Sequence, residues 1–203
     1  MYRILFSIVL FGLLADILHA QKEEETLFSK ARVSGGFGGP FWTSSRGAGD
    51  LGWGGGGGGG VVFGHFFLGG FGQAEVFDYQ GVDGVEHELS LGMGGLWLGV
   101  SYPTHKVIHP YGSLKFGWGS LSLTPRGPSN DSELSDAVFA LIPEVGLELN
   151  MLKWFRLVGH VGYRWVNGVD RLGDKVRARD FDSVVWGVTL RFGSFSSSSA
   201  YDD

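Results

Sequence analysis

A strict alternation of apolar and polar residues in the last third of the chain limits the fold most strongly. From Val184 to Phe192 every second residue is apolar, and the intervening positions include Thr189 and Arg191. A period of two residues is typical of a β-strand with one apolar face. Residues 154–166 and 138–149 repeat this design, so we expect three consecutive strands.

Glycine makes long helices unfavourable in the rest of the chain. The sequence has 36 glycines among 203 residues, and each glycine inside a helix costs about 1 kcal/mol relative to alanine. Hydrophobic residues still make up 43% of the chain, enough to drive folding. We interpret the run Gly54–Gly60 as a strand covered by rings from neighbouring strands, with a flexible loop as the alternative.

With that strand included, the sequence predicts eight strands. They are residues 31–42, 54–63, 66–78, 87–101, 110–123, 138–149, 154–166 and 182–193. In the first strand we expect Phe37 and Phe41 on the apolar outer face. Bulges are expected at Gly94–Gly95 and near Ser120, where the apolar residues change phase.

The N-terminus has the pattern of a secretory signal peptide. Arg3 precedes the apolar run Ile4–Leu14, and Ala20 offers a cleavage point. The run is too short to span a bilayer as a helix, although a membrane anchor is the alternative. We expect a signal peptide in residues 1–20, a periplasmic tail in 21–30, the folded body in 31–195, and a flexible C-terminal tail in 196–203.

Long and short connections alternate between the predicted strands. The segments after the first, third, fifth and seventh strands are long, whereas those after the second, fourth and sixth are shorter. Bacterial outer-membrane barrels have this asymmetry, with short periplasmic turns and longer outer loops. A closed barrel also satisfies every backbone group in lipid. The predicted fold class is therefore all-β, an eight-stranded antiparallel up-and-down transmembrane β-barrel.

These features together resemble a known class of protein. The signal peptide, the alternating strands, the turn at Leu149–Trp154 and the ending Val184–Phe192 look like small eight-stranded outer-membrane barrels of the OmpA-transmembrane or OmpX kind. The resemblance implies location in the cell outer membrane, contact with its lipids, and a terminal aromatic residue, Phe192 or Phe195, read by the barrel-insertion machinery.

Aromatic residues near the strand ends are candidates for two interfacial girdles. They are Trp42, Trp53, Tyr79, Tyr163 and Trp165 near the outer ends, and Tyr102, Tyr111, Trp154 and Phe192 near the inner ends. The alternative is that these rings are ordinary strand-end aromatics.

Charged residues fall mainly on the second face of the strands, which would line the lumen. The expected lumen network contains Arg32, Glu75, Glu88, Lys115, Glu144, Glu148, Arg156, His160, Arg164 and Arg191. An eight-stranded barrel is only wide enough for side chains to fill it, so these charges must pair. A polar plug is the main expectation, and a narrow pore for ions or small solutes is the alternative.

Other function classes find little support in the sequence. The chain has no cysteine, and its net charge of −5 without a basic block argues against nucleic acid as a partner. No histidine lies in a recognisable catalytic or metal-binding pattern, so we expect no cofactor, metal or catalytic residue. The favoured function is structural or interactive, through outer loops that contact an unknown extracellular partner. A barrel enzyme acting on lipid is the second alternative.

Overall fold

The computed structural model describes residues 33–80, 86–125, 134–170, 172 and 176–195. The predicted signal peptide (1–20) and the two predicted tails (21–30 and 196–203) lie outside the described residues. The chain divides into two units, 1–31 and 32–203, and the description below concerns the second. Among the described residues, no helix is long and apolar enough to cross a membrane.

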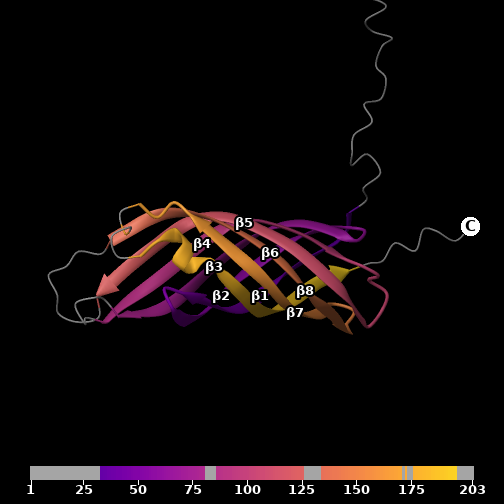
Figure 1. The fold of residues 1–203 in the computed structure, drawn as a ribbon. Helices are drawn as coiled ribbons and strands as arrows, with labels where there is room; N and C mark the ends of the chain where they lie inside the picture. Colours follow the sequence, from indigo (N-terminus) through magenta and orange to yellow (C-terminus); the bar gives the residue numbers. More distant parts are fainter. Residues whose placement is uncertain (1–32, 81–85, 126–133, 171, 173–175, 196–203) are drawn as a thin grey trace, which may run out of the picture. The chain divides into compact units, whose positions relative to one another are not determined.

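The described strands form one closed antiparallel barrel in chain order, with β8 pairing back to β1 (Figure 1). They are β1 (Val33–Gly47), β2 (Asp50–Phe63), β3 (Phe66–Gln80), β4 (Glu86–Ser101), β5 (Ile108–Pro125), β6 (Leu134–Leu152), β7 (Phe155–Asn167) and β8 (Ser183–Phe195). A short 3₁₀ helix, η1 (Ala178–Phe181), precedes β8. The predicted eight-stranded up-and-down fold is confirmed, and closure leaves no strand edge unpaired.

The glycine run is a strand, as expected from the count. Gly54–Gly60 pairs with β1 on one side and β3 on the other. Rings from neighbouring strands occupy the space that side chains would need on the inner face: a Cβ at Gly58 would lie 3.0 Å from the Trp97 ring, and one at Gly52 would lie 2.3 Å from the Phe77 ring. Glycine therefore makes room for large side chains in the lumen.

The first connection is shorter than expected. We predicted a long loop over 43–53, but β1 extends to Gly47 and β2 begins at Asp50. Ala48 (φ 51°) and Gly49 (φ 97°) make the turn, with the positive φ angles of a type I′ hairpin. The strands continue because the polar residues Thr43 and Ser45 bind groups inside the barrel, as described below.

The facing of β1 was also predicted wrongly. Phe37 and Phe41 are 7% and 1% exposed and point into the lumen, whereas Trp42 is 54% exposed on the outside. In β6, β7 and β8, by contrast, the charged residues lie inside and the apolar series lies outside, as expected. No charged residue marks the inner face of β1, so alternation alone could not distinguish the two faces.

The expected bulges in β4 and β5 are absent, and the pairing between these strands is continuous. Leu89, Leu91, Leu121 and Leu123 all point inward, while Leu96 and Leu98 further along β4 point outward. The leucines change from one face of the strand to the other because the surroundings of the two faces differ along the barrel. Towards the loop end of the barrel, apolar side chains fill the interior, and on the outside Ser90 replaces the leucines.

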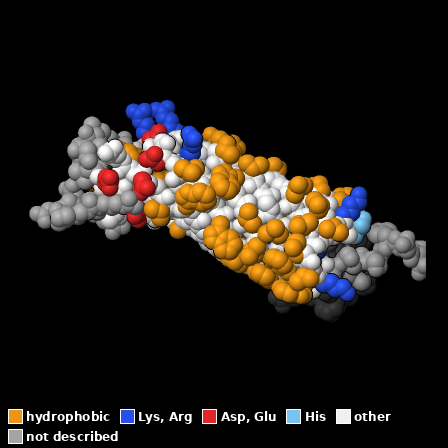
Figure 2. Space-filling view, turned by 90° about the horizontal axis from the view of Figure 1, so that it is seen from below, with side chains coloured by type: hydrophobic (Ala, Val, Ile, Leu, Met, Phe, Trp, Pro, Cys, Tyr) orange, Lys and Arg blue, Asp and Glu red, His pale blue; other side chains and the backbone are white. Residues whose placement is uncertain are grey.

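Large apolar side chains cover much of the outer surface elsewhere (Figure 2). Leu147, Val145 and Val188 are 58%, 64% and 40% exposed. On the face shown in Figure 2, acidic side chains gather at the loop end of the barrel, and Lys, Arg and His appear at the opposite end. This apolar band with charged ends is the surface expected of a barrel embedded in a bilayer.

Candidate functional site

Charged side chains inside the barrel form three clusters along the lumen. The inner cluster, nearest the turn that joins β6 and β7, is centred on Glu148. Arg156 Nη1 donates to Glu148 Oε1 at 2.5 Å, and Arg191 Nη1 donates to Oε2. His109 Nε2 lies 3.2 Å from Oε1, and Ser101 Oγ donates to Oε2 at 3.3 Å. One buried carboxylate is therefore shared by two guanidinium groups.

The middle cluster is centred on Glu144, two inward positions from Glu148 towards the loop end of β6. Lys115 Nζ donates to Glu144 Oε1 at 2.9 Å, and Ser113 Oγ donates to Oε2 at 2.6 Å. His160 Nδ1 lies 3.5 Å from the same carboxylate. The Lys115 ammonium also sits 4.4 Å from the centre of the Phe41 ring and 5.0 Å from that of Trp97, within the range of cation–π attraction. Aromatic rings thus replace water around this buried cation.

The outer cluster pairs Glu75 of β3 with Arg164 of β7 across the barrel. Arg164 Nη1 donates to Glu75 Oε2 at 2.7 Å. Thr43 Oγ1 and Ser45 Oγ donate to the two oxygens of the same carboxylate at 2.8 and 2.5 Å. Glu75 and Arg164 are fully buried, so removing either partner would leave an uncompensated buried charge.

An apolar cluster, the apolar cap, lies at the loop end of the lumen beyond the outer cluster. Leu172, Val176 and Phe181, from the segment between β7 and β8, are at most 2% exposed and join the hydrophobic core that contains Phe77. Asp136 of β6 anchors the segment, because its carboxylate accepts hydrogen bonds from the backbone N–H groups of residues 170 and 172. The connection therefore folds into the barrel opening.

The structure places most of the predicted lumen residues in these clusters. Glu75, Lys115, Glu144, Glu148, Arg156, His160, Arg164 and Arg191 all point inward and are buried. Arg32 lies outside the described residues. Glu88 is half-buried on the other face of β4: its neighbours His87 and Leu89 are buried in the lumen, so alternation turns Glu88 outward. The mistake follows from the expected phase change in β4.

Sequence reasoning missed several hydroxyl and imidazole partners of the carboxylates. Thr43 and Ser45 fall in the predicted connection between the first two strands, and His109 falls just before the fifth. Ser101 and Ser113 fall within predicted strands but were not proposed as partners of the carboxylates. Once the charged residues of β6 and β7 mark the lumen, register with the neighbouring strands identifies these partners, but register is not visible in a single sequence.

The predicted aromatic girdles are placed only in part on the outer surface. Seven of the predicted rings are exposed: Trp42, Trp53, Tyr102, Trp154, Tyr163, Trp165 and Phe192. Tyr111, by contrast, is 4% exposed and stacks on Phe67 inside the lumen. Tyr79 is half-buried and packs against the inner core beside His87. Tyr111 and Tyr79 lie on the inner face of their strands. Their position near a strand end does not indicate which face they are on.

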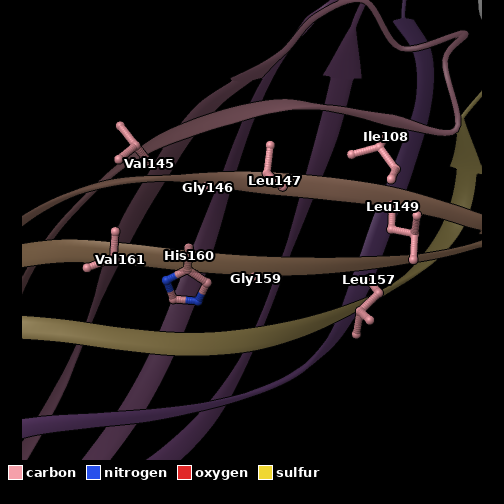
Figure 3. Close-up of a pocket in the computed structure, with 9 residues that line it drawn as sticks. All are labelled: Ile108, Val145, Gly146, Leu147, Leu149, Leu157, Gly159, His160 and Val161. Carbon is pink, nitrogen blue, oxygen red and sulfur yellow. The ribbon is translucent and has the colours of Figure 1, made fainter.

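A shallow apolar groove of about 440 Å³ lies on the outer surface over β6 and β7 (Figure 3). Its sides are Val145, Leu147 and Leu149 on β6 and Leu157 and Val161 on β7, with Ile108 at one end. Gly159 leaves space between them, since a Cβ there would meet nothing within 4 Å. The groove lies in the apolar band, so a lipid acyl chain is the ligand that its chemistry fits.

Metal binding has no support in the described part of the chain, where no group of three or more His, Cys, Asp or Glu could hold an ion. The charged groups instead bind one another. Their arrangement can stabilise the barrel and obstruct the lumen.

Comparison with known proteins gives the family of the chain. The family model described as outer membrane protein beta-barrel domain matches residues 7–201. No curated protein matches the sequence.

Solved structures similar to this chain include three bacterial surface or outer-membrane proteins. Neisserial surface protein A is 10% identical, with a TM-score of 0.53 over 79% of this chain and 96% of that one. The N-terminal β-barrel domain of OprF from Pseudomonas aeruginosa is 15% identical (TM-score 0.45, 79% and 98% covered). Ail from Yersinia pestis is 14% identical (TM-score 0.46, 78% and 96% covered). The resemblance inferred from the sequence is confirmed: the chain belongs to the outer membrane protein beta-barrel family and is an integral protein of the outer membrane.

Proposed function

We propose that this protein is a closed outer-membrane anchor, without enzymatic activity, whose outer loops make contact with an extracellular partner. The observation that carries the proposal is the burial of the charged side chains that point into the lumen. Three ion-paired clusters and an apolar cap follow one another from the inner to the outer end, and their charged side chains are all less than 9% exposed. A solute would have to break buried ion pairs in order to pass.

The narrow-pore alternative gives a different electrical signature. With the lumen closed, the purified protein in a planar bilayer should show no stable conductance. A pore would give small, steady current steps, and replacing Glu144 and Glu148 together by Ala would shift its selectivity towards anions. Steady steps in the wild-type protein would overturn the closed lumen.

For the lipid-enzyme alternative, His160 is not an accessible base. His160 is 6% exposed and lies inside the barrel, where its Nε2 is 3.4 Å from Thr189 Oγ1 and its Nδ1 faces Glu144. His160 is among the residues that line the groove of Figure 3, but its side chain points into the barrel, on the opposite face of the sheet from Val145 and Leu147. Purified protein incubated with outer-membrane lipid is therefore expected to leave the lipid unchanged.

The loop assignment can be tested in intact cells with trypsin. Arg177 and Arg179 are exposed in the segment between β7 and β8, whereas Lys153 is exposed in the turn at the opposite end. Cleavage of whole cells should occur in the β7–β8 segment and spare Lys153, with both sites cut after lysis. Cleavage at Lys153 alone in intact cells would show that the barrel has the opposite orientation in the membrane. It would therefore refute a role for these loops outside the cell.

A further inference from the structure

A second hollow, of about 870 Å³, lies at the inner mouth of the lumen. Asn150, Met151, Leu152 and Lys153 line it from the end of β6 and its turn. Arg156 lines it from β7, and Ser194 and Phe195 line it from the end of β8. Unlike the groove on the lipid face, this hollow brings a guanidinium and an ammonium to one place. These are the donor groups of an anion site.

The charges around the hollow do not balance. In the inner cluster, Arg156 and Arg191 share the single carboxylate of Glu148, so one positive charge remains when His109 is neutral. Arg191 is 2% exposed, and its Nε is buried without a hydrogen-bond acceptor among the described residues. A bound anion at the inner mouth would offset this excess positive charge.

Arg156 is positioned to bind such an anion. Its Nη1 is held by Glu148, and its guanidinium lies 3.9 Å from the centre of the Phe195 ring. Within the described residues, Nη1 is the one nitrogen of this guanidinium with a protein acceptor. The remaining N–H groups belong to a side chain that lines the hollow. Its orientation is therefore fixed before a ligand arrives, which reduces the entropic cost of binding.

The surface around the hollow is also basic. Lys153 is exposed in the turn between β6 and β7, and Lys106 and His105 are exposed in the neighbouring turn between β4 and β5. Figure 2 shows Lys, Arg and His side chains at this end without the acidic side chains that, on the same face, accompany Lys and Arg at the loop end. Such a field attracts anions towards the inner mouth.

We propose that the inner mouth of the barrel is a phosphate-binding site, in which Arg156 and Lys153 bind a phosphate group. Guanidinium groups bind phosphate through paired N–H donors, and lysine adds a compact positive charge. Two sources can supply this chemistry at the inner surface of the membrane: the headgroup of a phospholipid, or free phosphate from the periplasm. The site is independent of whether the lumen conducts or the loops bind a partner.

The test uses the full mature protein in a non-ionic, phosphate-free detergent. Inorganic phosphate is titrated by calorimetry. In a parallel arm, native mass spectrometry counts the lipids retained from micelles doped with phosphatidylglycerol or with a phosphate-free galactosyl diacylglycerol. We expect saturable binding of phosphate, of phosphatidylglycerol, or of both, and no retention of the galactolipid. Phosphate alone identifies the free ion as the source, and phosphatidylglycerol alone identifies the headgroup.

The variants separate this site from general attraction to a basic surface. Lys153→Gln and Arg156→Lys should each weaken binding about tenfold, the effect of losing one charge-assisted hydrogen bond. Arg156→Lys keeps the charge opposite Glu148 and so protects folding. Lys106→Gln is the matched control, because it removes the same charge from a neighbouring turn that does not line the hollow.

Two results would overturn the proposal. One is the absence of saturable binding by both phosphate probes. The other is an equal loss of affinity in Lys106→Gln and Lys153→Gln, because binding would then follow surface charge alone. Gel mobility with and without heating confirms that each variant remains a folded barrel, so loss of affinity cannot be mistaken for unfolding.

Discussion

Arg164 Nε donates a hydrogen bond to the backbone carbonyl oxygen of Phe181 at 3.1 Å, while Nη1 of the same guanidinium donates to Glu75. One side chain therefore joins the ion-paired lumen to the segment that caps it. Phe181 in turn packs its ring 5.7 Å from that of Phe77 on β3. The position of the apolar cap and the ion pair of the outer cluster therefore depend on the same side chain, Arg164.

The first prediction concerns this link. Arg164→Gln should destabilise the barrel by about 3–5 kcal/mol, because it leaves the Glu75 carboxylate buried without its positive partner. Urea unfolding of the protein in lipid vesicles, followed by tryptophan fluorescence, measures the change. Glu88→Gln is the control on the outer face, where a charge change should cost less than about 1 kcal/mol. Equal losses in the two variants would contradict the placement of Glu88.

A second prediction concerns the apolar cap. Phe181→Ala should cost about 3–5 kcal/mol, the usual range for emptying a buried phenylalanine site. The β7–β8 segment should also become more sensitive to protease, since it loses its main contact with the core. Arg179→Ala removes an exposed side chain of the same helix and should leave both measurements nearly unchanged. Unaltered protease sensitivity in Phe181→Ala would show that the segment is held elsewhere.

The third prediction tests where lipid ends on the outer surface. Leu147→Arg should destabilise the protein by about 2–4 kcal/mol if its side chain lies near the bilayer midplane. Ser90→Arg, on the outward face of β4 towards the loop end, should change stability by less than about 1 kcal/mol. Refolding titrations into vesicles compare the two. A large penalty at Ser90 would move the edge of the lipid band towards the loops.

The fourth prediction separates the two faces of the glycine strand. A Cβ at Gly56 would lie 2.0 Å from the carbonyl oxygen of Gly72, whereas one at Gly57 would lie 3.6 Å from its nearest neighbour. Gly56→Ala should therefore cost about 1–3 kcal/mol through overpacking, and Gly57→Ala should be close to neutral. Unfolding curves of the two variants check this. Similar stabilities would mean that the strand can shift to accommodate a methyl group.

The sequence by itself determined the number and order of strands, the closed fold and the lumen residues of β6, β7 and β8. Charges alternate with apolar residues in those strands, and a charge in a membrane protein has to face away from lipid. The same logic predicted Glu144, Glu148, Arg156, Arg164 and Arg191 on the inner face. Here the residue type alone decides the direction.

Only the tertiary structure decided the facing of β1 and of the outer parts of β4 and β5. Phe37 and Phe41 are apolar and could face either lipid or the lumen. In the structure they face the lumen, where the centre of the Phe37 ring lies 3.7 Å from the Arg191 guanidinium and that of the Phe41 ring lies 4.4 Å from the Lys115 ammonium. Leu89 and Leu121 are equally ambiguous until the cap is in place. An apolar side chain indicates only that its position is shielded from water. The register of neighbouring strands determines whether lipid or the barrel interior surrounds it.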